Sequence, residues 1–434
     1  MNDREAEECT TLLEAPGDGR IGEKGGEART KRIPRRNLRK RTMIRLHKKL
    51  DPSVTGHEAE RLQAGLLKRI VGQDEAVQQI VNIYQMYLAG MNTPGRPIGN
   101  FLFLGPTGTG KTRLVEATAE CLLGNPKSIT KIDCSEFQHS HEIAKLIGSP
   151  PGYLGHRETH ALLSQEMLKQ FHTDQVKVNF VLFDEIEKAS DALWNLLLGI
   201  LDKATLTLGD NRRVCFDDAM IFMTSNLGAA EMGALLTPKL GFGSAEVERQ
   251  QRAGNADPDL DRKIARTGLD AARRKFTPEF LNRIDKTVVF KPLGSWELQR
   301  ILNIELGLLQ QRIFNAGSAI PFVFGLSADA KSHLLREGTD LKYGARHLKR
   351  SMERSLVHPM SNLIASGQIR PGDFLKIEYD QETDGLTFIK EAEEVPPLEM
   401  MGIAETSNLA QAAAAAVVKD MEYRVVSARV ERNR

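Results

Sequence analysis

The sequence predicts an α/β fold in which a parallel β-sheet, covered by helices on both faces, precedes a smaller and mostly helical domain. Short apolar runs alternate with helical stretches up to Phe290, and such alternation is typical of a parallel sheet. After Pro292 helical patterns dominate, which indicates a second domain. The predicted strands of the sheet are Phe101–Leu104, Ile129–Ile132, Phe180–Phe183, Ala219–Thr224 and Thr287–Phe290. The predicted elements of the second domain are helices Trp296–Asn315, Ala328–Glu337 and Arg346–Ser366 and a strand at Phe374–Tyr379.

The composition is that of a globular protein. The chain has 434 residues, of which 41% are hydrophobic and 27% charged, with a net charge of +2. This length favours two or three packed units. No apolar run approaches the roughly 18 residues that a membrane span requires, and the polar first residues do not resemble a signal peptide. The four cysteines show no C-x-x-C spacing, which argues against a zinc ribbon or a disulfide framework and favours a reducing cytoplasm.

Four regions follow from these patterns. Residues 1–57 are rich in glycine and charge and lack sustained apolar periodicity, so we expect a flexible basic arm. A helical pattern starts near Glu58. We therefore predict a large domain at 58–290, a small domain at 291–390 and a variable tail at 391–434.

A glycine-rich segment carries the strongest chemical signal. Residues 105–112 satisfy the pattern G-x-x-x-x-G-K-[ST], directly after a predicted strand and before a predicted helix. Its glycines let backbone N–H groups point at phosphate oxygens, and the helix N-terminus adds positive potential. The motif predicts that Lys111 neutralises the β- and γ-phosphates of a nucleotide and that Thr112 binds Mg²⁺. The candidate phosphate-binding residues are Gly105, Pro106, Thr107, Gly108, Thr109, Gly110, Lys111 and Thr112.

Polar residues follow two other predicted strands. Asp184 and Glu185 come directly after Phe180–Phe183, where they would lie beside the phosphate loop. Asp184 is the second candidate Mg²⁺ ligand, and Glu185 is the candidate general base for an attacking water. Asn226 follows the next strand, where a polar side chain can orient that water.

These motifs, with further segments in the same order, resemble the Clp unfoldases of the AAA+ class. The resemblance is closest to the second ATPase module of ClpA, ClpB and ClpC, and it runs from about Leu66 to Tyr379. The segments that carry it are Val71-Gly72-Gln73, GPTGTGKT at 105–112, IDCSEF at 132–137, PPGYLG at 150–155, DEIEKA at 184–189, MTSN at 223–226, FTPEFLNRID at 276–285 and YGAR at 343–346. The resemblance implies an AAA+ P-loop ATPase domain with a small lid domain, which hydrolyses ATP with Mg²⁺.

The resemblance also assigns roles to single residues. Ile70 and Val71 correspond to the hairpin that contacts adenine, and Asn226 to the first sensor. Arg283 stands where the family carries the finger that reaches the γ-phosphate in a neighbouring subunit. Arg346 corresponds to the second sensor. A finger supplied in trans implies a homo-oligomer, by family a hexamer, and a nearly inactive monomer.

A pore loop is implied by Gly152, Tyr153, Leu154 and Gly155. An aromatic side chain between glycines can grip any extended chain through apolar contact. The resemblance therefore predicts an ATP-driven unfoldase that threads polypeptides through a central pore. Because the chain has a single phosphate loop, we expect a one-ring relative. It also departs from the family at Lys203-Ala204, where Asp-Gly is usual.

Two questions stay open at this stage. Leu240, Gly241 and Phe242 form an aliphatic–glycine–aromatic tripeptide that either docks on a ClpP-type peptidase or anchors its own loop. The basic segment Thr30–Lys49 is either a solvated arm, a contact for an acidic protein partner or membrane lipid, or a nucleic-acid contact. A nucleic-acid contact would make the protein a remodelling ATPase on nucleic acid or nucleoprotein. The segment lacks the interleaved aromatic residues that stack on bases.

Overall fold

The computed structural model describes residues 51–52, 54–148, 161–236, 258–315, 321–340, 344–396 and 402. The chain divides at Pro52 into two units, and the elements that follow belong to the unit formed by residues 53–434. Three sets of predictions lie outside the described residues: nearly all of the arm at 1–57, the loop Gly152–Gly155 and the tripeptide Leu240–Phe242. Most of the tail after Glu391 does so as well.

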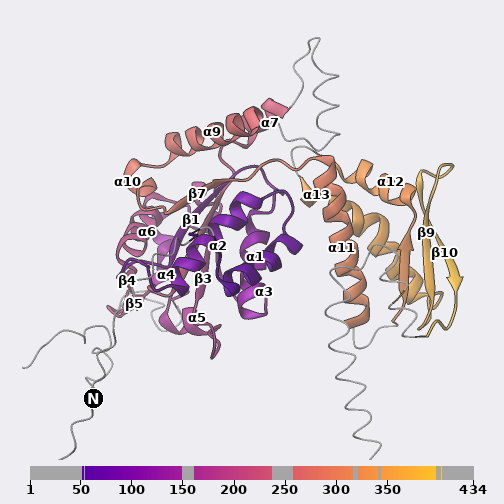
Figure 1. Cartoon of the computed structure of the whole chain (residues 1–434), viewed down its shortest axis with the longest axis horizontal. Coiled ribbons are helices and arrows are strands. Elements are labelled where there is room, and N and C mark those ends of the chain that lie inside the picture. The colour runs from indigo at the N-terminus through magenta and orange to yellow at the C-terminus, as the bar shows by residue number, and fades with distance from the viewer. Residues whose placement is uncertain are drawn as a thin grey trace, which may run out of the picture. The chain divides into compact units, whose positions relative to one another are not determined.

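A five-stranded parallel sheet forms the centre of the larger part of this unit (Figure 1). The strand order is β2-β3-β6-β1-β7, so the chain crosses over between neighbouring strands. The strands are β1 (Gly99–Leu104), β2 (Thr130–Asp133), β3 (Asn179–Asp184), β6 (Ala219–Ser225) and β7 (Lys286–Val289). All five predicted strands are thereby confirmed, with ends shifted by one or two residues. Because the strands are parallel, their carboxyl ends meet at one edge of the sheet.

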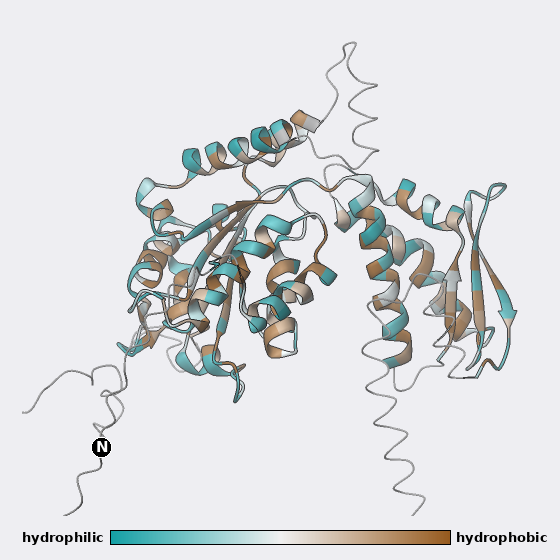
Figure 2. Cartoon of the chain, in the orientation of Figure 1, coloured by the Kyte–Doolittle hydropathy of each residue, from teal (hydrophilic) through white to brown (hydrophobic). Residues whose placement is uncertain are grey.

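Side chains alternate between the two faces of the sheet along each strand, and each face has its own apolar core. Phe101 and Phe103 of β1 pack on one side with the first three helices, while Leu102 and Leu104 pack on the other side with α6. Strands buried on both faces are continuous apolar runs in the sequence. Figure 2 shows these strands largely in brown, whereas the helices around them carry both hydrophobic and hydrophilic residues. The helices of this part are α1 (His57–Arg69), α2 (Asp74–Leu88), α3 (Lys111–Leu123), α4 (Ala144–Ile147), α5 (Gln165–Lys169), α6 (Asp191–Lys203), α7 (Ala229–Leu236), α9 (Pro258–Lys275) and α10 (Pro278–Leu281).

A second core, with its own small sheet, follows Pro292. Its helices are α11 (Ser295–Asn315), α12 (Ala328–Gly338), α13 (Ala345–Met352) and α14 (His358–Ala365), with a π-helical turn at Glu353–Val357 between the last two. Its sheet has the order β10-β9-β8, from strands β8 (Val323–Leu326), β9 (Phe374–Asp380) and β10 (Gly385–Ala392). The predicted helices and the strand at Phe374–Tyr379 are confirmed. Strands β8 and β10 were missed, because Gly325 interrupts the apolar run of β8 and because no residue of β10 is fully buried.

A short hairpin of β4 (Thr205–Thr207) and β5 (Arg213–Cys215) was also missed. It begins at Ala204, which ends α6 in the left-handed region with φ 48°. Glycine, the usual residue of the Clp unfoldases at this position, adopts this conformation without steric cost. In this chain the alanine methyl is fully buried in the core, and that burial offsets part of the strain.

No helix in the described ranges is long and apolar enough to cross a membrane.

Close packing of α12 on α13 gives a test of the second core. A Cβ atom added at Gly338 would lie 2.8 Å from the backbone Cα of Leu348, so the helices would have to move apart. We expect Gly338→Ala to destabilise this core by about 1–3 kcal/mol, measured by calorimetric unfolding. The matched control is Gly199→Ala in α6, where the added methyl makes only an ordinary contact of 3.6 Å and should stabilise the helix by about 0.5–1 kcal/mol. Equal unfolding temperatures for Gly338→Ala and the unsubstituted chain would contradict this packing.

Candidate nucleotide-binding site

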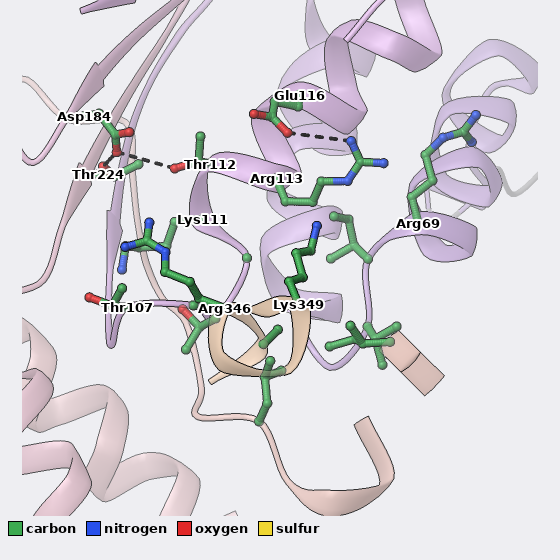
Figure 3. A pocket seen from close by; sticks show the side chains of 18 of the residues that line it. Arg69, Thr107, Lys111, Thr112, Arg113, Glu116, Asp184, Thr224, Arg346 and Lys349 are labelled. Carbon is green, nitrogen blue, oxygen red and sulfur yellow. Dashed lines mark hydrogen bonds and ion pairs between the residues drawn. The ribbon is translucent and has the colours of Figure 1, made fainter. Parts of the chain in front are cut away.

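A cavity of about 390 Å³ lies at the carboxyl edge of the large sheet. It is lined by the loop 107–112, by the ends of β3 and β6 and by residues of α11 and α13 (Figure 3). Lining residues therefore come from both cores.

The glycine-rich loop has a conformation that only glycine adopts easily. Gly105, Gly108 and Gly110 have φ values of 140°, 78° and 100°. At Gly105 a Cβ atom would also lie 2.6 Å from the carbonyl oxygen of Phe290. The loop turns directly into α3, so the N-terminus of this helix faces the cavity. This arrangement suits the binding of phosphate.

Lys111 is buried under the loop with a relative exposure of 7%. Its ammonium donates hydrogen bonds to the carbonyl oxygens of Gly105 (2.6 Å) and Pro106 (2.8 Å) and to Oδ1 of Asn226 (2.9 Å). Burial lowers the pKa of Lys111 to about 8, against the opposing effect of nearby carboxylates, Glu187 first among them. The positive charge is thus held in a poorly solvated place, where a polyphosphate would be its natural partner.

Asp184, at the end of β3, is held by three neighbours. Its Oδ1 accepts a hydrogen bond from the hydroxyl of Thr224 and lies 3.4 Å from Oγ1 of Thr112. Its Oδ2 forms an ion pair of 2.9 Å with Lys131 of β2. The oxygen atoms of Thr112 and Asp184 are the hard donors that Mg²⁺ prefers, and their proximity fits the predicted pair of ligands. In the described part of the chain no cluster of three or more His, Cys, Asp or Glu residues could hold a metal alone.

Glu185 and Asn226 face each other across the strand ends. Nδ2 of Asn226 donates to Oε1 of Glu185 at 3.2 Å, and its backbone N–H donates to Glu187 at 3.0 Å. Lys188 forms an ion pair with Glu185. Glu185 itself has left-handed backbone angles of φ 58° and ψ 48°. The structure thus brings together Lys111, Thr112 and these two side chains, which the sequence singled out separately.

Apolar side chains also line the cavity. Ile70 and Val71 are buried at 6% and 5% exposure and line it, and Leu293, Ile301 and Ile304 line it as well. Such a surface can accept the flat face of a nucleobase.

Gln73 belongs to the segment Val71-Gly72-Gln73 that carries the family resemblance, but the sequence assigned it no role. It is buried, and its side-chain amide donates to the carbonyl oxygens of Thr109 (3.3 Å) and Lys291 (2.9 Å). It also accepts from the N–H of Lys291 at 3.1 Å. Gln73 therefore fastens the phosphate loop to the segment after β7. A polar residue directly after the Val71-Gly72 turn was the available signal.

Arg346 is brought to the cavity by the first turn of α13. The N–H of Ala345 donates to the carbonyl oxygen of Gly108 at 3.1 Å, which joins this helix to the phosphate loop. Figure 3 shows the side chain of Arg346 reaching toward Lys111 and Thr107. Its charge is one of the influences on the pKa of Lys111. The predicted second sensor thus lies in the cavity of its own chain.

Arg283 lies elsewhere, just after α10. Its guanidinium pairs with Glu279 at 3.1 Å and with Asp202 at 3.8 Å, and 23% of the side chain is exposed. A group in this position cannot be placed in the cavity of its own chain without moving. A role toward a neighbouring chain stays a prediction.

Comparison with known proteins identifies the relatives of this architecture. The family model described as the AAA domain (Cdc48 subfamily) matches residues 96–287. The model of the C-terminal, D2-small domain of ClpB protein matches residues 293–377.

Curated relatives include the chaperone protein ClpB of Pseudomonas putida, which is 38% identical over 323 residues, 74% of this chain and 34% of the relative. ClpB of Bdellovibrio bacteriovorus is 36% identical over 327 residues, 75% of this chain and 34% of the relative. The chain therefore matches about a third of the length of these relatives.

Solved structures with this fold include the extended Hsp104:casein complex of S. cerevisiae, with a TM-score of 0.62 and 26% identity over 76% of this chain and 52% of that chain. A closed Hsp104 complex with ATPγS and FITC casein has a TM-score of 0.61 and 26% identity, covering 77% of this chain and 52% of that chain.

The matched domains, in this order, confirm the resemblance found in the motifs. Residues 96–377 of this chain therefore form a Clp-family AAA+ ATPase module that resembles the second ATPase module of ClpB.

Proposed function

We propose that the protein is a Mg²⁺-dependent ATP hydrolase that assembles into a homo-oligomeric ring, as a hexamer, and uses the hydrolysis to unfold and thread polypeptides. The observation that carries the proposal is the convergence of Lys111, Asp184, Glu185 and Asn226 at one cavity edge. The comparisons support it, since the curated relatives are chaperones. The similar solved structures are Hsp104 complexes with casein, one of which also contains ATPγS.

The side chains divide the chemistry among them. Lys111 binds the β- and γ-phosphates from below the loop, and Arg346 approaches from the small domain. Glu185 accepts a proton from the attacking water, and Asn226, bonded to both Glu185 and Lys111, orients that water against the γ-phosphate. Thr112 and Asp184 hold Mg²⁺, which neutralises charge on the phosphates when bound.

Arg283 would complete the site of a neighbouring chain. Its pairing with Glu279 and Asp202, outside its own cavity, is compatible with a surface between subunits. A ring assembled in this way makes each chain dependent on the next for catalysis.

Several finer assignments stay predictions because they fall on residues outside the described ranges. They include the pore loop with Tyr153, docking of Leu240–Phe242 on a ClpP-type peptidase, and the nucleic-acid alternative based on Thr30–Lys49. A cytoplasmic location stays a prediction as well.

Subunit mixing tests the ring. Arg283→Ala alone should lower the ATPase rate by about 10³-fold or more, because the finger stabilises transition-state charge. Glu185→Gln alone should also be inactive. A mixture of the two inactive variants should recover activity, since a chain with an intact Glu185 can receive the arginine of its Glu185→Gln neighbour.

The matched control for this experiment is Arg273→Ala, which removes an exposed arginine paired with Asp270 on α9 and should leave the rate unchanged. Absence of recovery at protein concentrations that form rings would contradict a finger supplied in trans.

The buried ammonium predicts a pH dependence of binding. Above pH 8 the free protein holds Lys111 mainly neutral, because burial lowers its pKa to about 8. Bound phosphate raises this pKa again, so nucleotide binding must take up a proton. We expect calorimetry of ADP binding, in buffers of different ionisation enthalpy, to show the uptake of about one proton at pH 9 and a much smaller uptake at pH 7. The affinity for ADP should be about tenfold weaker at pH 9 than at pH 7. An affinity independent of pH over this range would contradict the assignment.

The pore loop predicts a separation of activities. Tyr153→Ala removes the aromatic side chain expected to grip the substrate, but it leaves every cavity residue in place. We expect ATP hydrolysis to persist and unfolding of a fluorescent protein substrate to be lost. Normal unfolding by this variant would refute threading through this loop.

A further inference from the structure

Thr224 lies between the two acidic residues of the site. It belongs to β6, is buried at 1% exposure and lines the cavity. The last paired residues of β3 and β6 are Phe183 and Met223, so the next residues along each strand, Asp184 and Thr224, lie side by side. The sequence patterns included Thr224 only as part of the segment MTSN at 223–226 and assigned it no role.

The hydroxyl of Thr224 bonds to both acidic residues at once. It donates a hydrogen bond to Oδ1 of Asp184, and it accepts a hydrogen bond of 3.1 Å from the backbone N–H of Glu185. A threonine hydroxyl has one proton and two lone pairs, so one group can satisfy both bonds. Valine, which has the same shape, can make neither.

The contact with Glu185 stabilises an unfavourable backbone. A non-glycine residue at φ 58° and ψ 48° costs on the order of 1 kcal/mol and persists only where neighbours hold it. The N–H bond to Thr224 holds the backbone of Glu185, and the amide of Asn226 holds its carboxylate at 3.2 Å. Together these contacts set the direction in which the carboxylate points.

The contact with Asp184 stabilises the orientation of its carboxylate. Thr224 bonds to Oδ1, and Lys131 pairs with Oδ2 at 2.9 Å, so both oxygen atoms have partners. Oδ1 also lies 3.4 Å from the hydroxyl oxygen of Thr112. Rotation of the carboxylate would break both bonds.

We propose that Thr224 is a positioning residue that sets the orientation of the metal-binding Asp184 and of the general base Glu185 together. This inference rests on the proposed function of the site. A single hydroxyl thereby links the place of the metal to the place of the attacking water, and its loss disturbs both.

The test compares Thr224→Val with Thr224→Ser in the full chain. The first readout needs no turnover: ADP binding is measured by calorimetry with excess Mg²⁺ and with EDTA. Groups that orient metal ligands typically contribute about 10–100-fold to metal affinity or activity. We expect Thr224→Val to lose a factor of this size from the Mg²⁺-dependent part of the affinity, while its affinity in EDTA stays unchanged. In ATP hydrolysis, kcat should fall by a similar factor with little change in KM, and Thr224→Ser should restore both readouts.

The matched control is Thr118→Val in α3. Thr118 is also fully buried, and its hydroxyl donates to the carbonyl oxygen of Leu114 at 2.7 Å, away from the cavity. We expect its Mg²⁺-dependent binding and kcat to equal those of the unsubstituted chain. If Thr224→Val does not fold, Thr224→Cys, whose thiol is a weak donor and acceptor, replaces it in the comparison with Thr224→Ser.

Three results would overturn the proposal. They are an unchanged Mg²⁺-dependent affinity in Thr224→Val, a Thr224→Ser variant as impaired as Thr224→Val, or an equal loss in Thr118→Val. Failure of the proposed function is a separate outcome. A chain that hydrolyses no ATP would refute that function, whereas binding of ADP with and without Mg²⁺ would still test Thr224.

Discussion

The parallel pairing of β1, β3 and β6 is the constraint on which the site depends. Each strand ends at the same edge of the sheet, and each is followed by a different chemical group: the phosphate loop, the pair Asp184 and Glu185, and Asn226. Parallel pairing requires burial on both faces, and the two apolar cores that flank the sheet provide it. The groups are thus positioned by a rigid, water-excluded framework.

Polar bonds then organise this edge into one network. Lys111 contacts Asn226, Asn226 contacts Glu185, and Thr224 bonds to Glu185 and Asp184. In a poorly solvated environment such bonds restrict side chains more strongly than they would in water. The reacting groups are therefore already oriented toward each other within one chain, while Arg283 is held by carboxylates away from them. Under the proposed function, this difference in placement is the reason why the site of one chain would need Arg283 of a neighbouring chain.

Sequence patterns were sufficient for the sheet and for most of the site because their signals are local. A strand buried on both faces is a run of apolar residues, and the phosphate loop needs glycines at fixed spacing. Weak or short signals failed. No residue of strand β10 is fully buried, and Gly325 interrupts the apolar run of β8. The hairpin of β4 and β5 follows a buried alanine in a conformation that normally indicates glycine.

The sequence by itself determined the strand order along the chain, the phosphate loop and the identity of the acidic and amide groups, because each is encoded within a few neighbouring residues. Only the tertiary structure decided which side chains bond to one another. Gln73 joins the loop to Lys291, which lies far along the chain, and Thr224 bonds to the last residue of β3 and to the residue after it. Such contacts depend on the register between strands and on the packing of distant segments, and no local pattern of residues specifies them.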